Sequence, residues 1–409
     1  MIGLYQIWRC FELETRIVIK HTGVEQFDET MALSQFAFQY ERSAAELEQT
    51  KEQYESEPTV RYGAYVDNQL AAQAAVLKLQ TYIGGKVFDM GGIAGVATWP
   101  EFRRQGLVAQ ILIQSLIEMK ENGQTVSFLH PFSFSFYRKF GWETYTELKT
   151  YTIKTDMLPA RIAYEGRFER ITGNYGLLND VYQAYASQFN GSLVRDEFWW
   201  NYRINRRKPG QTALYYDKSG AAQGYVIYEV KNSRLTVHEF VHLNEPARAA
   251  IWSFLAQHDS MIEELTIKMP SNDRLPYLLS NPRIKQEITP YFMARIVDAE
   301  AFVSQYDFKA ADHADDIHIQ LIDAQAPWNN GHFSLHIDAS GKASLRRKDD
   351  SEKIDEAIKL DIGSFTSVLF GYIQLEQLAQ FARIEGDIGL VKRLQSRIPE
   401  RTTYLPDFF

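Results

Sequence analysis

The 409-residue sequence predicts an α+β protein with mixed α/β layers, in which two related domains precede a third of different character. Three observations predict this fold class. Residues 89–142 have the pattern of a strand, a glycine-bearing loop, an amphipathic helix, a strand and a turn. Residues 212–269 repeat the order hairpin, strand, helix, strand, and short alternating strands follow from about residue 300. A chain of this length exceeds one hydrophobic core, so two or three domains are expected.

The first domain is expected over residues 15–155. It follows an N-terminal extension, 1–14, which has neither a basic leading region nor a small-residue cleavage site and is therefore not interpreted as a signal peptide. Helical patterns through about Lys51 separate the first strand from a hairpin that turns at Asp67-Asn68. The strands of this part are predicted at 15–22, 59–66 and 70–80. The unit at 89–142 completes the domain.

The loop before the predicted helix of that unit is its most informative segment. Gly106 allows a ligand to approach the backbone, and the helix that follows directs unpaired N–H groups and the positive end of its dipole at the loop. Arg103 and Arg104 add donors suited to phosphate oxygens. A basic loop with one glycine is also an ordinary solvated loop, but the flanking strand and helix favour phosphate binding. Asn122-Gly123 predicts the end of the helix, and its apolar spacing predicts one buried face: Leu107, Val108, Ile111, Leu112, Leu116 and Met119.

A second, diverged copy of the first domain is expected over residues 156–297. Its predicted helices lie at 176–187 and at 246–258, the latter starting near Asn244, and its predicted strands at 212–216, 224–230, 235–243 and 265–269. The strand-to-helix junction at 242–248 has no glycine and little basic charge, so it lacks the features that cradle a diphosphate. We interpret this copy as structural and expect it to form one wall of the acceptor site.

The third domain is expected over residues 298–409. Strands are predicted at 317–322, 331–337, 342–346 and 360–362, and helices at 364–370, 375–383 and 390–395. The last nine residues, 401–409, are apolar, whereas a disordered tail is normally polar. The composition therefore predicts that this tail docks.

The loop Arg103-x-x-Gly106-x-Val108 resembles that of the GNAT superfamily of N-acetyltransferases, whose pattern is Arg/Gln-x-x-Gly-x-Gly/Ala, so Val108 is a departure. The chain is similar in particular to the enhanced-intracellular-survival (Eis) branch. That branch has a run like Arg-Arg-Gly-Leu-Leu at this loop. About thirty residues further on it has the motif Phe-Tyr-x-Arg/Lys-Phe-Gly-Tyr/Trp, which Phe136 to Trp142 match. Its last residue is aromatic, as is Phe409. Length and domain order agree from about residue 15. The resemblance implies tandem GNAT folds, active then diverged, and a C-terminal domain like a sterol carrier protein.

The resemblance also implies a site for acetyl-CoA as co-substrate. Tyr137 stands where the family has its general acid, and its phenol, with an ordinary pKa near ~10, is protonated at neutral pH and can donate to a thiolate. The free α-carboxylate of the last residue, here Phe409, acts as the general base in the family. Cofactor contacts are expected from Val96, Ala97, Thr98, Arg103, Arg104, Gln105, Gly106, Leu107, Val108, Ala109, Phe132 and Ser133. Some members have an acidic residue near the first helix, and residues 36–40 contain no clear match for it. Near the chain end the acidic residue is Asp407, and Phe408 separates it from Phe409. Because of these two differences, aminoglycoside acceptance is not assumed.

Composition bounds the partners and the compartment. The net charge of −8, without a dense Lys/Arg stripe, gives nucleic-acid binding little electrostatic support. No apolar run reaches membrane-spanning length, and the single cysteine, Cys10, suits a reducing cytoplasm, where we expect the protein. The histidine pairs, such as His238 and His242, lack the cysteine or paired carboxylates of a metal site, so no metal is predicted. A homo-oligomer, a hexamer by resemblance, is expected.

The leading functional hypothesis is therefore an enzyme. It would move an acetyl group from acetyl-CoA to a primary amine of a small molecule or a lysine side chain, by direct transfer in a ternary complex. The alternative is a non-catalytic protein that binds CoA or an apolar ligand through the sterol-carrier-like domain, and Val108 keeps it open. A third, aminoacyl transfer by a paired GNAT protein, is disfavoured by that same domain.

Overall fold

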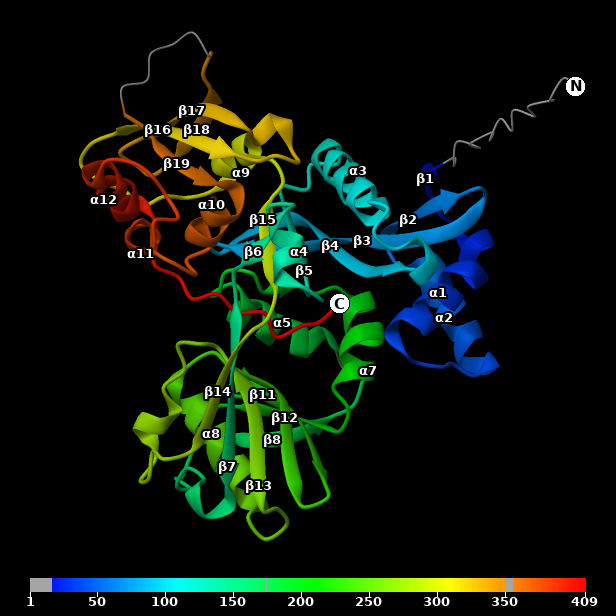
Figure 1. Cartoon of the computed structure of the whole chain (residues 1–409). Helices are drawn as coiled ribbons and strands as arrows, with labels where there is room; N and C mark the ends of the chain where they lie inside the picture. Colours follow the sequence, from blue (N-terminus) through cyan, green and yellow to red (C-terminus); the bar gives the residue numbers. More distant parts are fainter. Residues whose placement is uncertain (1–16, 174, 350–355) are drawn as a thin grey trace, which may run out of the picture. The chain divides into compact units, whose positions relative to one another are not determined.

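The computed structural model describes residues 17–173, 175–349 and 356–409 (Figure 1). The predicted extension at 1–14, Cys10 and the first two residues of the strand predicted at 15–22 lie outside the described residues. Two compact units make up the chain: Met1–Val76 with Gly95–Gln114, and Leu77–Ala94 with Ser115–Phe409. Three elements continue from one unit into the other: β3 (Gln69–Ile83), β4 (Lys86–Thr98) and α3 (Leu107–Glu121).

The first unit contains the predicted hairpin. Asp67 and Asn68 adopt positive φ of 49° and 68°, the conformation of a tight turn between strands, so this prediction is confirmed. β1 pairs antiparallel with β2, and a small core of Leu33, Tyr65, Leu70 and Ala97 forms beside them. The remaining elements of this unit are β1 (Ile17–His21), α1 (Phe27–Phe38), α2 (Ala44–Ser56) and β2 (Thr59–Val66).

Helix α3 ends as its sequence predicts. Gly123 follows it with φ of 74°, and the N–H groups of Gly123 and Gln124 donate to the carbonyls of Lys120 and Met119. A left-handed glycine with such bonds satisfies carbonyls at a helix C-terminus. The chain then enters β5 (Val126–Leu129), which pairs parallel with the first half of β4.

Beyond β5, the first sheet takes in a strand from far along the chain. β15 (Met293–Ile296) pairs antiparallel with β5 on one side and with β6 (Glu143–Thr144) on the other. In exchange, β7 (Glu147–Lys154), which directly follows β6, pairs with β13 and β14 of the second sheet. Each of the two sheets therefore includes one strand from the part of the sequence that forms the other sheet.

The second sheet has seven strands in the order β14-β7-β13-β12-β11-β10-β8. Its further strands are β8 (Arg167–Ile171), β10 (Gln211–Tyr216), β11 (Ala222–Lys231), β12 (Arg234–His242), β13 (Glu264–Met269) and β14 (Lys285–Pro290). The helices of this region are α5 (Tyr175–Ala186), α6 (Glu197–Trp199), a π-helical turn at Trp200–Ile204, α7 (Asn205–Arg207) and α8 (Glu245–Leu255). The side chain of Asn244 caps α8, as predicted, and β9 (Leu193–Val194) pairs with β3.

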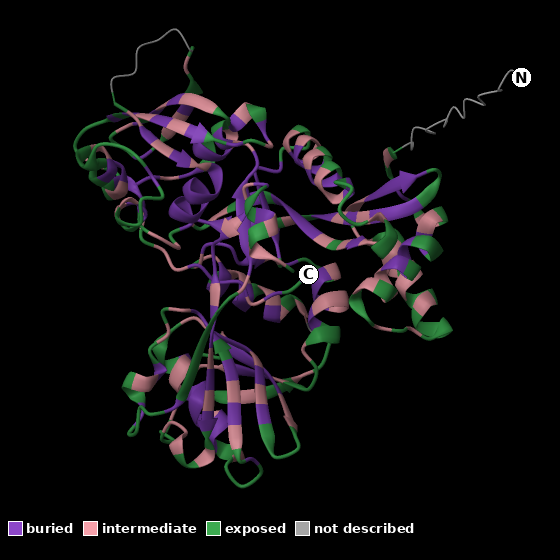
Figure 2. Cartoon of the chain, viewed as in Figure 1, coloured by how far each residue is buried: buried purple, intermediate pink, exposed green. Residues whose placement is uncertain are grey.

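The third sheet has four strands in the order β18-β17-β16-β19. Buried positions alternate with half-buried or exposed ones along β16 and β17 (Figure 2), as expected for strands with one covered face. The strands are β16 (Asp315–Ile322), β17 (Gly331–Ile337), β18 (Ala343–Arg347) and β19 (Ile358–Asp361). The helices are α9 (Ala299–Gln305), α10 (Ile362–Leu369), α11 (Leu375–Gln380) and α12 (Ile388–Arg397).

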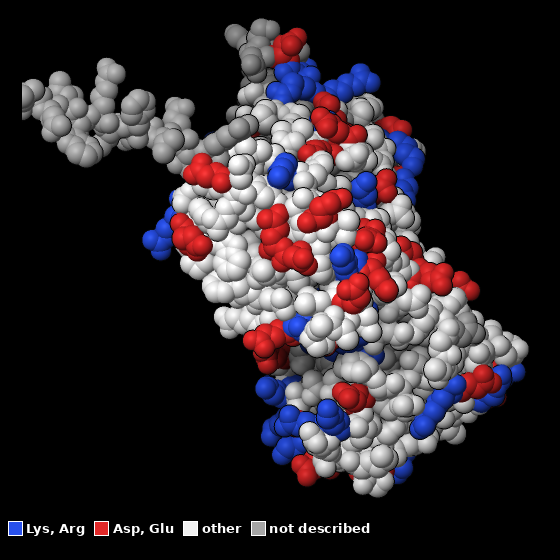
Figure 3. Space-filling view, turned by 90° about the vertical axis from the view of Figure 1, so that its right-hand side faces the viewer, with Lys and Arg blue, Asp and Glu red and all other residues white. Residues whose placement is uncertain are grey.

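The C-terminal segment after α12 docks on the protein, as its apolar composition predicts (Figure 1). Thr403 forms a bridge with Asn190, Leu405 is fully buried, and Phe409 is only 6% exposed. Within the described part of the chain, no helix is both long and apolar enough to span a membrane. On the face that Figure 3 shows, Lys and Arg side chains lie among Asp and Glu side chains, in keeping with the modest net charge of −8.

Candidate active site

The predicted phosphate-binding loop lies in the first unit, between β4 and α3. Arg104 and Gly106 have positive φ of 65° and 78°, which turn the backbone sharply before α3 begins at Leu107. Arg103, Arg104 and Gly106 are exposed, and a Cβ on Gly106 would meet no atom within 4 Å. The exposed guanidinium groups, the open space and the first N–H groups of a helix together suit a diphosphate.

Two hydrogen bonds hold this loop from within. Nε of Arg103 donates to the carbonyl of Thr98 at 3.4 Å, and Nε2 of Gln105 donates to the carbonyl of Glu101 at 3.3 Å. Both bonds use one nitrogen of a side chain that has several donors, so each side chain keeps N–H groups for a ligand.

The predicted pantetheine strand is the second half of β4. The β4–β5 ladder covers Met90 to Ile93, and Gly95, with φ of 61°, interrupts the extended backbone two residues later. Ala97 is buried in the core of the first unit, whereas Val96 and Thr98 are half-buried. The Ala97 side chain therefore serves packing, and the backbone groups of this segment are the candidates for pairing with ligand amides.

The first turn of α3 corrects one expectation. The predicted buried face is confirmed for Leu107, Ile111, Leu112, Leu116 and Met119. Val108 is only half-buried, as is Ala109, because both lie on the first turn beside the exposed loop. The residue that departs from the family pattern thus borders the loop and is not part of the core.

Tyr137 lies in the second unit, on the short helix α4 (Phe134–Arg138). The hydroxyl of Ser133 caps this helix by accepting from the N–H of Phe136 at 3.4 Å. The ring of Tyr137 is 2% exposed and lies 5.2 Å from the ring of Phe132, which is itself 69% exposed. Burial raises the pKa of the Tyr137 phenol above its ordinary value, so this group keeps its proton at neutral pH.

Phe409 packs on the inner part of β4, also in the second unit. Its ring lies against the backbone of Gly92 and 4.9 Å from the ring of Phe292. The ring of Trp199 is 6.3 Å away, edge to face. Of the predicted site residues, the structure brings Phe132, Ser133 and Tyr137 together around α4 and places Phe409 beside β4.

His130 is a candidate that the sequence reasoning missed. It directly follows β5, is exposed, and has the ring of Phe408 at 4.9 Å. Although the residue as a whole is exposed, the rings of Tyr291, Phe292 and Phe408 pack around its imidazole, and this desolvation lowers its pKa and favours the neutral form. A lone histidine after a strand carries no signal in sequence, and only its nearness to the tail singles it out.

A cavity of about 420 Å³ adjoins this part of the second unit. Trp199, which touches the Phe409 ring, lines it together with Leu79, Asp89 and Asp196. Both carboxylates already accept hydrogen bonds, Asp89 from Gln80 and Asp196 from the backbone N–H of Trp199. The lining therefore combines hydrogen-bonded acidic groups with the apolar side chains of Leu79 and Trp199.

Metal ligands do not gather in the part of the chain that the structure describes. No group of three or more His, Cys, Asp and Glu side chains there is arranged to hold an ion. His242, on β12, has its pKa lowered to about 4, chiefly by burial and then by Arg248, so it is a neutral, packed histidine.

Comparison with known families covers most of the chain. Residues 18–145 and residues 191–296 each match the acetyltransferase (GNAT) domain, and residues 299–406 match the sterol carrier protein domain. The second match is to the region that we predict to be a diverged GNAT copy. The fold class predicted from sequence, tandem GNAT folds followed by a sterol-carrier-like domain, is therefore confirmed.

Individual relatives agree with this assignment. A conserved Enterococcus faecalis protein, designated a probable N-acyltransferase, is 30% identical, with a TM-score of 0.90 over 97% of this chain and 100% of its own. Eis1 of Mycobacterium abscessus, at 20% identity, shares the fold with a TM-score of 0.79 over 96% of this chain and 100% of its own. N-acetyltransferase Eis of Mycobacterium tuberculosis is 26% identical over 241 residues, 55% of this chain and 59% of that protein.

The alignments with curated N-acetyltransferases of Streptomyces griseus and Mycobacterium tuberculosis span 56% and 59% of those proteins' lengths, and the alignment with one of Streptomyces avermitilis spans 77%. The structural match to the Enterococcus faecalis protein, in contrast, extends over that whole chain. With two GNAT domains, a sterol carrier protein domain, the Enterococcus faecalis relative and the Eis proteins that it resembles, the chain belongs to the Eis-type GNAT acetyltransferases.

Proposed function

We propose that this protein is an N-acetyltransferase that uses acetyl-CoA and acetylates a primary amine of a small molecule or of a lysine side chain. The observation that carries the proposal is the loop at 103–106, where two exposed arginines and a glycine with positive φ precede a fifteen-residue helix. In a GNAT domain this geometry suits the diphosphate of CoA. Gln105 and the first turn of α3, Leu107 to Ala109, complete the proposed contact.

The chemistry requires an acid and a base. As the amine attacks the thioester carbonyl and the C–S bond breaks, Tyr137 donates its phenol proton to the departing sulfur. The α-carboxylate of Phe409 accepts the proton that the amine nitrogen loses, since an α-carboxyl with an ordinary pKa of about 3.5 is ionised at neutral pH. The buried position of Tyr137 and the docked position of Phe409 support these roles.

Substrate contacts elsewhere follow from the same proposal. Backbone groups of Val96, Ala97 and Thr98 pair with the pantetheine amides, and Phe132 and Ser133 border the thioester end. Transfer in this proposal is direct, in a ternary complex: the amine attacks the thioester itself, and no side chain of the protein takes up the acetyl group in between.

One observation supports a second candidate function, that of a non-catalytic protein that binds CoA or an apolar ligand. Val108 stands where the family pattern has glycine or alanine, and it is half-buried beside the loop. A β-branched side chain at this position narrows the space next to the diphosphate.

The deciding experiment measures thiol release from acetyl-CoA with a panel of primary amines, together with CoA binding by calorimetry. Intact-mass measurement of the purified protein first establishes that the chain ends at Phe409. Amine-dependent thiol release with an acetylated product supports the enzyme. Measurable CoA binding without release for any amine supports the binding protein instead.

Assembly and domain limits stay part of the proposal. A homo-oligomer, a hexamer by resemblance, is checked by analytical ultracentrifugation. The limits 15–155, 156–297 and 298–409 and the cytoplasmic location stay predictions. The strands β7 and β15 each pair with the sheet of the other GNAT-like domain. A limit drawn along the sequence therefore assigns each of them to one domain, and a limit drawn by sheet assigns it to the other.

A further inference from the structure

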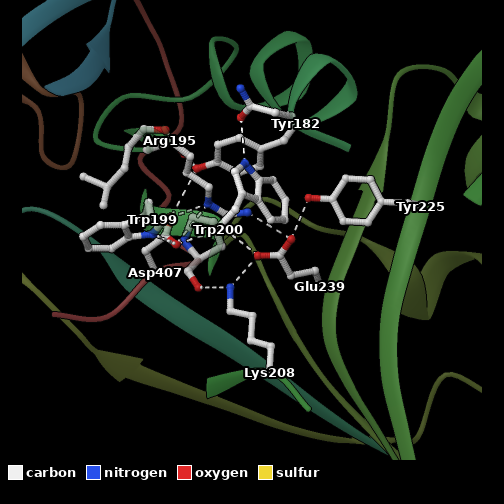
Figure 4. A network of polar contacts seen from close by, with 12 residues as sticks. Tyr182, Arg195, Trp199, Trp200, Lys208, Tyr225, Glu239 and Asp407 are labelled. Atoms are coloured by element: carbon white, nitrogen blue, oxygen red, sulfur yellow. Dashed lines mark hydrogen bonds and ion pairs between the residues drawn. The ribbon is translucent and has the colours of Figure 1, made fainter. Parts of the chain in front are cut away.

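The C-terminal segment carries a buried carboxylate, Asp407, which is 1% exposed. Three side chains of the second GNAT-like domain donate to it (Figure 4). Nε of Arg195 lies 3.1 Å from Oδ1, the indole N–H of Trp199 lies 2.9 Å from Oδ1, and the hydroxyl of Tyr182 lies 3.2 Å from Oδ2. Asp407 is thereby held by charge-assisted bonds from α5, from α6 and from the loop between β9 and α6.

A second carboxylate balances the charge of this cluster. Glu239, on β12, contacts Arg195 at 2.5 Å and Nζ of Lys208 at 2.5 Å, and it accepts from the hydroxyl of Tyr225 at 2.6 Å. Burial alone would raise the pKa of Glu239, but the two cations outweigh it and lower that pKa to about 2. The cluster thus holds two cations and two anions, a neutral set that is acceptable in a buried site.

The tail backbone is held at the same place. Nζ of Lys208 donates to the carbonyl of Pro406 at 2.8 Å, and the hydroxyl of Tyr291 donates to the carbonyl of Asp407 at 2.8 Å. Two residues further on, the ring of Phe409 lies against Gly92. The fixed point at 406–407 is therefore close to the end of the tail.

We propose that Asp407 and Arg195 are positioning residues that set the place of Phe409, and that the second GNAT-like domain is the receptor for the C-terminal tail. Slipping the tail by one residue would bring Pro406 or Phe408 to the cluster and leave Arg195 and Lys208 with one carboxylate between them. An uncompensated buried charge disfavours that register strongly. Apolar docking alone would not define the register so sharply, because hydrophobic contact is non-directional.

This inference rests on the proposed function where it concerns catalysis, since the base is the carboxylate of Phe409. Misplacing a reacting group by about 1 Å costs on the order of 100-fold in rate. We therefore expect Asp407→Asn to lower kcat by roughly 10- to 100-fold while the KM for acetyl-CoA stays within about 2-fold. Glu400→Gln is the matched control, an acid-to-amide change in the same segment at a side chain that is 84% exposed, and it should leave kcat unchanged.

A readout independent of activity is the release of the last residues by a carboxypeptidase that prefers aromatic ends. Phe409 is buried in the docked tail, so the wild-type protein and Glu400→Gln should resist release. Asp407→Asn should speed it at least about 10-fold, because the protease acts on the opened state. Equal release rates in all three proteins would overturn the anchor.

A double-mutant cycle separates positioning from mere folding. The partner change appends Gly-Ser after Phe409, which displaces the terminal carboxylate. If the anchor acts through that carboxylate, Asp407→Asn adds little further loss of kcat to the extended protein. Fully additive losses would mean that Asp407 is structural only. An extension without effect on kcat would overturn the base assignment in the proposed function, while the carboxypeptidase result still decides the anchor.

A milder variant serves if Asp407→Asn does not fold. Tyr291→Phe removes only the donor to the carbonyl of Asp407 and keeps the ring. It should show the same two changes, faster release of the last residues and lower kcat at unchanged KM for acetyl-CoA, at roughly a few-fold size, as one hydrogen bond permits. A folded Tyr291→Phe protein with wild-type release and wild-type kcat would contradict the proposal.

Discussion

Gly92 on β4 lies directly beneath the ring of Phe409: a Cβ built on Gly92 would lie 2.8 Å from Cε2 of Phe409 and 3.0 Å from Cδ1 of Leu79. The absence of a side chain at 92 thus gives Phe409 its place. Gly92→Ala should push the ring away and lower kcat by about 10-fold, since small misplacements near the chemistry are costly. Overpacking should also destabilise the protein by about 1–3 kcal/mol, measured by urea unfolding.

Gly176→Ala is the matched control for that change. A Cβ at Gly176, in α5, meets no atom within 4 Å, and alanine favours a helix over glycine. This variant should keep full activity and gain stability slightly. Wild-type kcat in Gly92→Ala would show that the position of the Phe409 ring does not matter for turnover.

Tyr137→Phe tests the proposed acid. The ring is buried and keeps its packing, but the proton donor is lost, so kcat should fall by roughly 100-fold or more at an unchanged dissociation constant for CoA. Steady-state kinetics and calorimetry measure the two quantities. Tyr277→Phe, at a residue that is 90% exposed, should behave as wild type. Parallel loss of turnover and CoA affinity in Tyr137→Phe would instead indicate a structural tyrosine.

The basic loop should govern affinity for acetyl-CoA rather than turnover. Replacing both Arg103 and Arg104 with glutamine removes two exposed cations next to the α3 N-terminus. We expect KM for acetyl-CoA to rise about 10-fold at low salt, with a smaller rise at high salt, where the wild-type contacts are screened. Arg161→Gln, an exposed arginine paired with Asp259, serves as control. If the double variant and Arg161→Gln have the same KM for acetyl-CoA, the loop does not belong to the proposed site.

Glu239 predicts how stability depends on pH. Its pKa in the folded protein, about 2, lies below the ordinary 4.5, so the folded state keeps it ionised where an unfolded chain binds a proton. The resulting stabilisation, on the order of 3 kcal/mol, is complete above about pH 4.5 and is lost as the pH falls towards 2.

Urea unfolding from pH 7 down to pH 3 measures this effect in wild type and in Glu239→Gln. The variant should be less stable at pH 7, because Arg195 and Lys208 lose a buried partner, and its stability should fall less steeply in acid. Glu287→Gln, at an exposed pair with Lys285, should follow the wild-type curve. Parallel curves for wild type and Glu239→Gln would contradict the assigned pKa.

Local patterns predicted much of this fold. The Asp67-Asn68 turn, the buried face and glycine end of α3 and the Asn244 cap depend on residues close in sequence, and the apolar composition of the tail predicts that it docks; each of these predictions is confirmed. The roles of the site residues, from Arg103 to Tyr137 and Phe409, stay predictions, because no contact with a ligand tests them.

Other features depend on distant partners and leave no local trace. Nothing in Met293–Ile296 indicates that this strand pairs with β5, more than 160 residues earlier in the chain. Arg195 and Glu239 lie 44 residues apart, and Asp407 lies 212 residues from Arg195, so the tail cluster cannot be read from spacing. His130 was missed for the same reason, since its neighbour Phe408 comes from the far end of the chain.

The crossing over of β7 and β15 has a consequence for how this protein can be dissected. A fragment that stops after β6 leaves the first sheet without β15, and one that starts after β7 leaves the second sheet without the strand that joins β13 to β14. Each fragment would expose an unmatched strand edge, the kind of surface that drives aggregation. The two acetyltransferase-like halves are thus interlocked, and neither half is a module that can be excised or transplanted alone.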